Sequence, residues 1–353
     1  MIKMKKRRYK RKTKKTSKRL LLGLFFVFLV GSVVLFAFTY KPANIECLCL
    51  IGASGQAIIS LDASDLTEKP IQVLRSLPLS HRYSFVWTKN RLYVGLTSSV
   101  TGYVYQINLK EETFKELEVP GTVMDIKTFH DKLFVITIDY STRKSYLIEV
   151  DLNSFSIVNK KVFSKYAPGT PYELAIAKDG KIFVVSYNSS SRVSYLSAFE
   201  GVKHLKTITV AGNAALHVET IEGKVYVRSR NELIVYSANT LSFITRVSSL
   251  YGYGAVRFQN GYFYVAGITR EGQPQLYILD SNLAIQSKIQ LSQTTGTATS
   301  LTFFEGKIFV LGLLHNLGCA VFLVDNNNVE MHVIPNTVNC WPSGIICLEA
   351  ERK

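Results

Sequence analysis

The sequence lacks the short motifs that mark many enzymes. It contains no HExxH, no GxSxG, no Walker-type phosphate loop and no CxxC. Zinc-protease, α/β-hydrolase, P-loop and thiol-redox chemistry therefore have no linear motif in its support. One G-x-G occurs, at Gly252–Gly254, but no helical pattern follows it, so it does not indicate a dinucleotide site. We predict no cofactor and no metal ion.

Acidic residues are missing from the N-terminus. Residues 1–19 hold 12 of the 42 Lys and Arg and none of the 26 Asp and Glu, so most of the net charge of +16 belongs to this segment. A tail of this kind can bind nucleic acid or orient a membrane segment. The residues that follow favour the second interpretation, and no nucleic-acid partner is expected.

Charge is also absent from Leu20–Phe38. As a helix, this segment would span roughly 28 Å, close to the ~30 Å hydrocarbon core of a bilayer. The basic residues before it predict a cytoplasmic N-terminus. We therefore predict a cytoplasmic tail at 1–19, a transmembrane signal anchor at 20–40 that contacts the lipid bilayer, and a linker at 41–44. The result would be a single-pass cell-membrane protein with its remaining residues extracytoplasmic.

A cleaved signal peptide is the alternative for this segment. Its apolar core would be longer than the usual ~7–15 residues, and no A-x-A site follows it. An uncleaved signal anchor fits these features better.

Sustained helical periodicity is missing beyond Pro42, and a strand signature recurs about every 43 residues instead. Several of these signatures follow a two-residue turn that ends in glycine, as tight hairpins do. The signatures are RLYV from Arg91, KLFV from Lys132, KIFV from Lys181, KVYV from Lys224, YFYV from Tyr262 and KIFV from Lys307.

The third strand of most units ends in Asp or Asn, as at Asp62, Asn108, Asp151, Asp280 and Asp325. Such residues cap turns with their side chains, so we read them as Asx-turns rather than as calcium ligands. A fourth strand follows in each unit. Four strands per repeat predict an all-β, seven-bladed β-propeller, with six or eight blades as alternatives.

The two ends of the repeat array are incomplete. The first unit begins at Ile45 without an inner strand, and residues 343–349 have inner-strand character without a hairpin partner. We predict that residues 343–349 pair with residues 45–51 and close the ring, which leaves no large open edge. The propeller would then span 45–349, with a short tail at 350–353.

Residues 175–227 contain a DGK-φ-[YF]-V strand, a polar bend and then a strand that ends before a glycine-containing loop. This pattern resembles the YVTN-type repeat of bacterial and archaeal propellers. The strand-ending Asp is missing at Phe199 and Ser237, and repeat lengths vary. The resemblance implies an extracytoplasmic seven-bladed ring, and because the family includes enzymes, binding proteins and assembly factors, it does not choose a function.

Loops that lead into the inner strands crowd one mouth of a propeller channel, which is the default place for a ligand. These loops carry aromatic and polar residues suited to a sugar ring or a planar ligand. The alternative is that the aromatic residues plug the channel. The candidate ligand-binding residues are His81, Tyr83, Tyr172, Glu173, His217, Glu219, Tyr251, Tyr253 and Trp341.

His217 and Glu219 are two residues apart on a predicted strand and share a face, so they suit a base with its partner or two metal ligands. No third ligand is apparent, and metal is not predicted. The outer loops add a basic rim. One interpretation is that this rim attracts an acidic polymer, and the other is that its residues belong to ordinary solvated loops. Its members are Arg143, Lys144, Arg192, Arg228, Arg230 and Arg270.

Five cysteines lie on the predicted outer side, where disulfides can form. Ring closure would bring Cys347 beside Cys47 or Cys49, and Cys319 and Cys340 are a second candidate pair. Packing of free thiols is the alternative.

Two functions remain open from the sequence. The first is a membrane-anchored extracytoplasmic binding or interaction module for an envelope protein or a cell-surface polysaccharide. The second is an extracytoplasmic propeller enzyme, such as a lyase, a lactonase or another hydrolase, with its site at the channel mouth.

Overall fold

The computed structural model describes residues 48–53, 55–98, 101–212, 214–334, 337 and 341–348. The predicted tail, signal anchor and linker, and residues 350–353, lie outside them. No helix among the described residues is long and apolar enough to cross a membrane.

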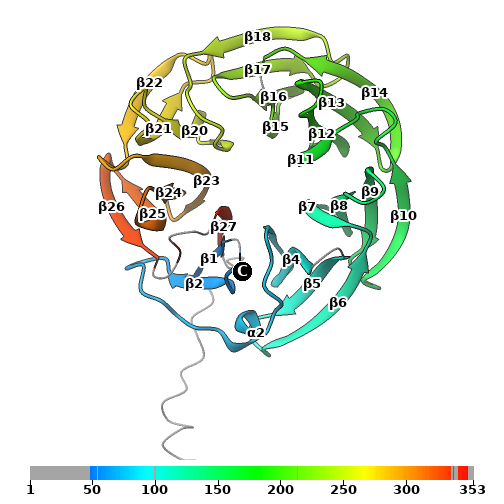
Figure 1. Cartoon of the computed structure of the whole chain (residues 1–353), viewed down its shortest axis with the longest axis horizontal. Coiled ribbons are helices and arrows are strands. Elements are labelled where there is room, and N and C mark those ends of the chain that lie inside the picture. The colour runs from blue at the N-terminus through cyan, green and yellow to red at the C-terminus, as the bar shows by residue number, and fades with distance from the viewer. Residues whose placement is uncertain are drawn as a thin grey trace, which may run out of the picture. The chain divides into compact units, whose positions relative to one another are not determined.

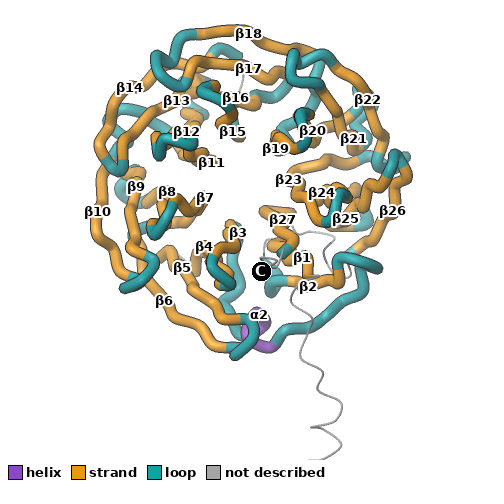
Figure 2. The backbone as a smooth tube through the Cα atoms, turned by 180° about the vertical axis from the view of Figure 1, so that it is seen from behind, coloured by secondary structure: helices purple, strands orange, loops and turns teal. Residues whose placement is uncertain are grey.

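The described residues form seven antiparallel sheets that surround a central axis (Figure 1). In each four-stranded sheet the strands follow one another in chain order from the axis outward, as Figure 2 shows. These sheets are β3 (Tyr83–Thr88), β4 (Arg91–Ser98), β5 (Thr101–Asn108) and β6 (Thr113–Val119); β7 (Thr122–Phe129), β8 (Lys132–Asp139), β9 (Lys144–Asp151) and β10 (Ser156–Val162); β11 (Thr170–Ile176), β12 (Lys181–Asn188), β13 (Val193–Glu200) and β14 (Lys203–Val210); β15 (His217–Ile221), β16 (Lys224–Arg228), β17 (Glu232–Ser237) and β18 (Phe243–Ser248); β19 (Val256–Gln259), β20 (Tyr262–Ile268), β21 (Pro274–Leu279) and β22 (Ile285–Gln290); β23 (Gly296–Phe304), β24 (Lys307–Leu314), β25 (Gly318–Asp325) and β26 (Asn328–Val333). The prediction of an all-β propeller with seven blades is confirmed, and the alternatives of six and eight blades are wrong.

The repeated strand signature forms the second strand of each four-stranded blade. At Asn260-Gly261 both residues have positive φ, 52° and 84°, which is the geometry of a tight hairpin whose twist matches the strands beside it. Along the second and third strands most residues are buried between neighbouring blades, whereas the outer strand β10 is exposed along its whole length. The apolar runs in the sequence therefore correspond to the middle of each blade.

Four of the Asp and Asn residues that end the third strands cap turns, as predicted: Asp62, Asn108, Asp151 and Asp280. The Asp151 carboxylate accepts from the backbone N–H groups of Asn153 and Ser154 at 3.1 and 2.7 Å. Asp280 accepts in the same way from Asn282 and Ala284 at 2.8 and 2.9 Å. Their recurrence is a folding signal.

The closing blade takes strands from both ends of the described chain, in the order β2 (Ile59–Asp62), β1 (Leu48–Ala53) and β27 (Pro342–Cys347). β27 pairs antiparallel with β1, Cys49 lies opposite Cys347, and these two cysteines form a disulfide. The pairing is the one that the two incomplete units predicted. Cys319 is buried, while Cys47 and Cys340 lie outside the described residues.

The closing blade departs from the expected pattern of four strands. Among the described residues, an isolated bridge between Leu61 and Glu68 and a short helix α2 (Gln72–Arg75) follow β2 in place of an outer strand. The blade still has a continuous core, because the side chain of Ile51 packs in one cluster with Leu311 of β24 and Val321 of β25.

Candidate functional site

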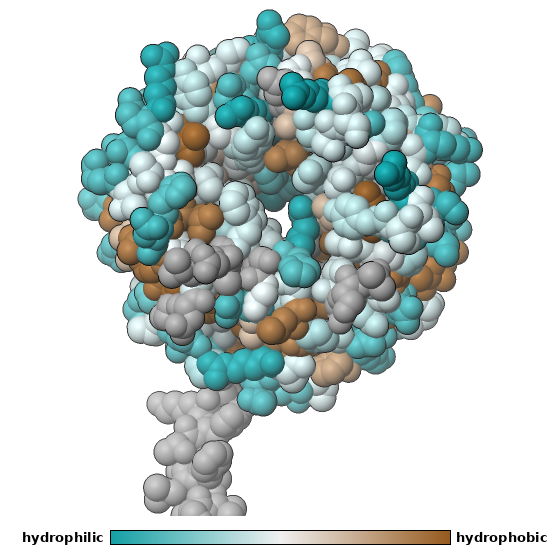
Figure 3. All heavy atoms as spheres, in the orientation of Figure 1, coloured by the Kyte–Doolittle hydropathy of each residue, from teal (hydrophilic) through white to brown (hydrophobic). Residues whose placement is uncertain are grey.

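A cavity of about 460 Å³ lies on the axis of the ring, and Figure 3 shows the molecule hollowed at its centre. Inner strands of every blade contribute to its wall, so the closed ring itself creates the cavity. Examples are Phe85 from β3, Lys127 from β7, Glu173 from β11, His217 from β15, Arg257 from β19, Ser300 from β23 and Ile345 from β27.

Most of the candidate residues from the sequence lie at this cavity. Glu219 and Tyr251 are not among the residues that line it. The lining candidates are His81, Tyr83, Tyr172, Glu173, His217, Tyr253 and Trp341.

Tyr83 has a structural position although it touches the cavity wall. Its side chain is only 1% exposed. Its hydroxyl donates to the carbonyl of Gln56 at 2.6 Å and accepts from the N–H of Ser80 at 2.9 Å. Both hydrogen-bonding functions are thus used within the protein, and this tyrosine has little left to offer a ligand.

Aromatic side chains do not fill the axial cavity that the described residues enclose. Trp341 is 59% exposed and Tyr253 is 39% exposed, so both are accessible at the cavity rim. The alternative that the aromatic residues plug the channel is not favoured, because the described residues leave a cavity of about 460 Å³ beside them. Open aromatic faces beside a polar cavity are suited to ring-shaped ligands.

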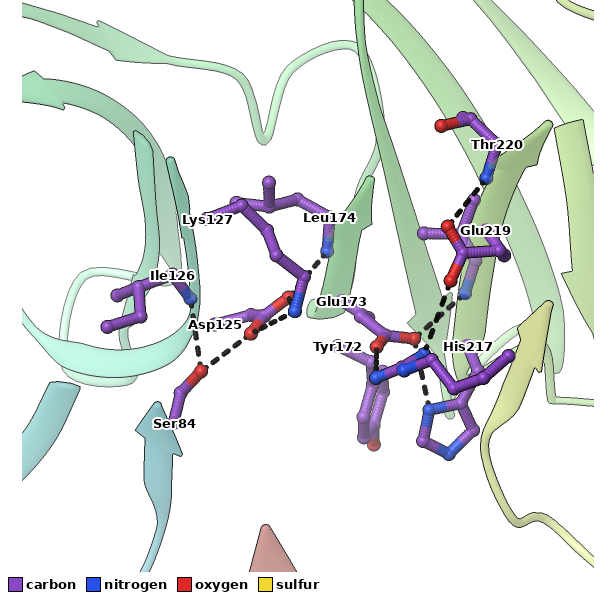
Figure 4. A network of polar contacts seen from close by, with 12 residues as sticks. Ser84, Asp125, Ile126, Lys127, Tyr172, Glu173, Leu174, His217, Glu219 and Thr220 are labelled. Atoms are coloured by element: carbon purple, nitrogen blue, oxygen red, sulfur yellow. Dashed lines mark hydrogen bonds and ion pairs between the residues drawn. The ribbon is translucent and has the colours of Figure 1, made fainter. Parts of the chain in front are cut away.

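Glu173 is the centre of the polar network in Figure 4. One carboxylate oxygen accepts from the N–H of Val218 at 2.9 Å and from His217 Nδ1 at 3.1 Å. The other oxygen accepts from an Arg257 nitrogen at 2.9 Å. Burial raises the pKa of Glu173, but the positive charge of Arg257 and the hydrogen bond from His217 outweigh burial and hold it below its ordinary value. Glu173 is therefore a buried, ionised acceptor.

The predicted pairing of His217 with Glu219 is not what the structure has. His217 hydrogen-bonds to Glu173 of the neighbouring blade, while Glu219 lies 3.8 Å from Arg257 and accepts from the N–H of Thr220 at 3.0 Å. Burial raises the pKa of Glu219, and Arg257 offsets part of that rise. No group of three metal-ligating His, Cys, Asp or Glu side chains occurs among the described residues.

Asp125 forms a second polar cluster on β7. Its carboxylate accepts from the Ser84 hydroxyl at 2.6 Å and from the N–H of Leu174 at 3.1 Å. Lys127 lies 3.5 Å away on the same strand. The Ser84 hydroxyl in turn accepts from the N–H of Ile126 at 3.2 Å.

The same position recurs in three successive inner strands. Ser84, Asp125 and Glu173 each accept the backbone N–H of a residue in the next inner strand along the ring. A buried N–H needs an acceptor, so these side chains join the blades as well as lining the cavity. Part of the charge in the candidate site therefore has a structural purpose.

Three charged lining residues were not selected from the sequence: Asp125, Lys127 and Arg257. Arg82 donates to the carbonyl of Tyr172 at 2.9 Å, which fixes it at the rim. The usable signal was a charged residue inside an otherwise apolar inner strand, as in Met124-Asp125-Ile126. The lining carries four Lys or Arg side chains and two carboxylates, so it favours a ligand with negative charge.

No family model matches the sequence, and no curated protein sequence matches it. Solved structures share the fold at low identity. A proposed 6-phosphogluconolactonase from Bacteroides fragilis is 13% identical, with a TM-score of 0.61, over 88% of this chain and 100% of that one. A protein from Lactobacillus plantarum is 12% identical, with a TM-score of 0.61, over 86% and 99% of the two chains.

A proposed 6-phosphogluconolactonase from Bacteroides uniformis gives 13% identity and a TM-score of 0.59 over 85% of this chain and 100% of that one. At such identities the likeness carries the architecture and not the chemistry. The chain is an all-β seven-bladed propeller whose fold is similar to that of these proteins.

Proposed function

We propose that the protein is a membrane-anchored, extracytoplasmic propeller that acts as a binding module for a component of the cell envelope. Its ligand is a cell-surface glycan or an envelope protein, taken up at the mouth of the axial cavity. The observation that carries this proposal is the cavity itself, which every blade lines and which exposed aromatic faces border.

The chemistry of the cavity supports binding. The side chains of Thr297, Thr299, Ser300 and Ser343 line one side of it. The hydroxyls of Thr297 and Thr299 donate to backbone carbonyls of the protein and keep acceptor capacity for a ligand. The carboxylates of Asp125 and Glu173 are held by hydrogen bonds within the protein. The wall thus combines hydroxyls, cations and aromatic rims, a combination suited to a glycan that carries negative charge.

Two features support an extracytoplasmic location. Residues 1–19 and Leu20–Phe38 have the pattern of a signal anchor with the N-terminus inside. The Cys49–Cys347 disulfide joins the first and last strands of the ring, and structural disulfides are typical of oxidising compartments outside the cytosol.

Affinity capture tests this proposal. Full-length protein in detergent would be immobilised and exposed to fractionated envelope extract, with a Trp341→Ala, His217→Ala double variant as the control. We expect the wild type to retain one polysaccharide or protein fraction and the double variant to retain at least tenfold less. Equal retention by both proteins would remove the cavity mouth as the binding site.

A second function, hydrolysis of a lactone or another ester, is favoured by one specific contact. When His217 Nδ1 carries the ring proton, it donates a hydrogen bond to Glu173. The other ring nitrogen, Nε2, is then an acceptor that can take a proton from water. The proposed activity of two structural neighbours as 6-phosphogluconolactonases is compatible with this reaction.

The enzyme alternative is tested with glucono-δ-lactone in a pH-stat assay. If His217 is a general base, His217→Asn should lower the enzymatic rate by about 10²–10⁴-fold, while Arg192→Gln, in an outer loop, leaves it unchanged. No rate above the uncatalysed background with the wild type would count against a lactonase.

A further inference from the structure

A second feature of the mouth lies in the loop Leu250–Gly254, which joins β18 to β19. Two tyrosines of this loop each lie against an arginine from a neighbouring loop. The guanidinium carbon of Arg230 is 5.6 Å from the centre of the Tyr253 ring, and that of Arg270 is 5.7 Å from the centre of the Tyr251 ring. Arg270 Nε also donates to the Tyr251 hydroxyl at 3.0 Å. These four residues are called the arginine–tyrosine pairs below.

The loop that carries both tyrosines is fixed from beneath by Arg228. This side chain is fully buried, although the sequence suggested that it belonged to the exposed basic rim. One of its terminal nitrogens donates to the carbonyls of Leu250, Tyr251 and Gly252 at 2.7, 3.3 and 2.9 Å. Burial lowers the pKa of Arg228 to about 10, so the guanidinium is charged at neutral pH and the loop is held by charge-assisted hydrogen bonds.

Arg230 and Arg270 differ from those arginines of the described chain that have a carboxylate partner. Arg75 and Arg246 lie beside Glu68 and Glu232, whereas none of the ion pairs between described residues includes Arg230 or Arg270. An aromatic face orients each guanidinium without neutralising it. The planar fork of N–H donors is then available to a carboxylate or a phosphate.

We infer that the arginine–tyrosine pairs bind an acidic polysaccharide that runs across the mouth of the channel. Each guanidinium takes one anionic group of the polymer, and the exposed faces of Tyr253 and Trp341 take its sugar rings. The inference rests on the proposed function and specifies its ligand class as a glycan with repeated negative charges.

A polysaccharide fits this surface better than an acidic protein or an anionic lipid surface. Arg230 and Tyr253 line the cavity together with Thr297 and Thr299. The hydroxyls of both threonines donate to backbone carbonyls of the protein and keep acceptor capacity for a ligand. A row of hydroxyls next to cations and open aromatic rings complements sugar hydroxyls, ring faces and carboxylates together. An acidic peptide or a lipid headgroup would use the cations alone.

Polygalacturonate is the probe for this inference, used with full-length protein in detergent and with neutral dextran as the comparison. We expect polygalacturonate to bind at low ionic strength and to weaken as salt is raised, and dextran to bind at least tenfold more weakly. The double variant Arg230→Gln, Arg270→Gln should raise the Kd for polygalacturonate at least tenfold and flatten its salt dependence. Tyr251→Phe, which keeps the ring and removes only the hydroxyl, should raise the Kd about two- to fivefold.

Arg192→Gln is the matched control, because Arg192 occupies a comparable exposed loop between the second and third strands of its blade. It should change the Kd less than twofold. All variants should keep the unfolding midpoint of the wild type, which shows that the ring is intact.

Three outcomes would overturn the inference: an equal loss with Arg192→Gln, no loss with the double variant, or poly-aspartate or phosphatidylglycerol vesicles binding as tightly as polygalacturonate. If the wild type ignores polygalacturonate but still retains an envelope fraction through Trp341 and His217, this inference fails and the proposed function stands. If it retains neither, both fail.

Discussion

Two arcs of the ring join their blades by different means. From β3 to β15, a polar side chain of one inner strand accepts a backbone N–H of the next, through Ser84, Asp125 and Glu173. Between β19 and β23 the backbones meet directly, since the N–H of Ala255 donates to the carbonyl of Thr299 at 2.9 Å. Gly254, just before this contact, is enclosed by the carbonyls of Ala266 and Ala298.

The comparison separates charge that holds the ring from charge that is available to a ligand. In the first arc the carboxylates satisfy the backbone of the next blade, so their burial is compensated. In the second arc Gly254, Ala255 and Ala298 meet at the joint and carry no carboxylate. The cations near this joint, Arg230 and Arg270, lie against aromatic rings instead. The arc around β19 therefore has the greater capacity to bind an added anion.

The largest effect is expected where a side-chain joint is removed from the first arc. Glu173→Ala leaves Arg257, His217 and the N–H of Val218 without their acceptor, so the free energy of unfolding should fall by about 3–5 kcal/mol. Thr299→Val, at the backbone joint of the second arc, should cost less than about 1.5 kcal/mol. Urea unfolding of both variants measures the difference, and equal losses would mean that the arcs are not joined differently.

The disulfide seam is a third kind of joint, and its loss ranks next. The bond links residues 298 positions apart, so replacing Cys49 and Cys347 by serine should cost about 2–5 kcal/mol. Dithiothreitol should lower the thermal midpoint of the wild type more than that of the double variant. A midpoint of the wild type that does not respond to the reductant would show that strand pairing alone closes the ring.

A smaller effect is expected from crowding the backbone joint. A Cβ at Gly254 would lie 2.5 Å from the carbonyl oxygens of Ala266 and Ala298, so Gly254→Ala should cost about 1–3 kcal/mol. Gly344→Ala is the control, because its nearest heavy atom would be 3.2 Å away, at the carbonyl oxygen of Tyr83. If the control is as unstable as Gly254→Ala, the close approach in the second arc is not the cause.

The smallest effect is the part of the pH dependence that Glu173 of the first arc contributes. The pKa of Glu173 in the folded protein lies below the 4.5 of an ordinary glutamate, so the unfolded chain binds more protons at acid pH. Its contribution to the free energy of unfolding is complete above pH 4.5 and declines as pH falls toward the lowered pKa, by at most about 1.4 kcal/mol per pH unit. Urea unfolding between pH 6 and pH 3.5 should show this decline in the wild type, and Glu173→Gln should lack it. An identical slope in both proteins would assign the acid sensitivity to other carboxylates.

Much of the architecture could be predicted from the sequence because a blade is a local object. Hairpin turns such as Asn260-Gly261 and strand-ending residues such as Asp151 report on neighbours within a few positions. Ring closure was also predictable, because two incomplete units at the ends of one array have only each other as partners. The absence of an outer strand after β2 was not predictable, since its replacement by the Leu61–Glu68 bridge and α2 has no marker in the repeat.

The site was predictable as a place but not as a set of contacts. The mouth loops correctly pointed to the surroundings of His217, but its partner, Glu173, is 44 residues away in another blade. Periodicity along one strand favoured Glu219 instead. Tyr83 and Tyr251 show the same difficulty. The sequence places each tyrosine in a mouth loop, but it does not show that the Tyr83 hydroxyl bonds to Gln56 and the Tyr251 hydroxyl to Arg270.

The position of β1 between two partners has a mechanical consequence. A pull on the chain at Leu48 would not peel an edge strand away, because β2 lies on one side of β1 and β27 on the other. The load would act along both strand pairs at once, and the sulfur–sulfur bond would transfer it to the last strand of the ring. Such a geometry resists detachment of β1 from the ring when load is applied at Leu48.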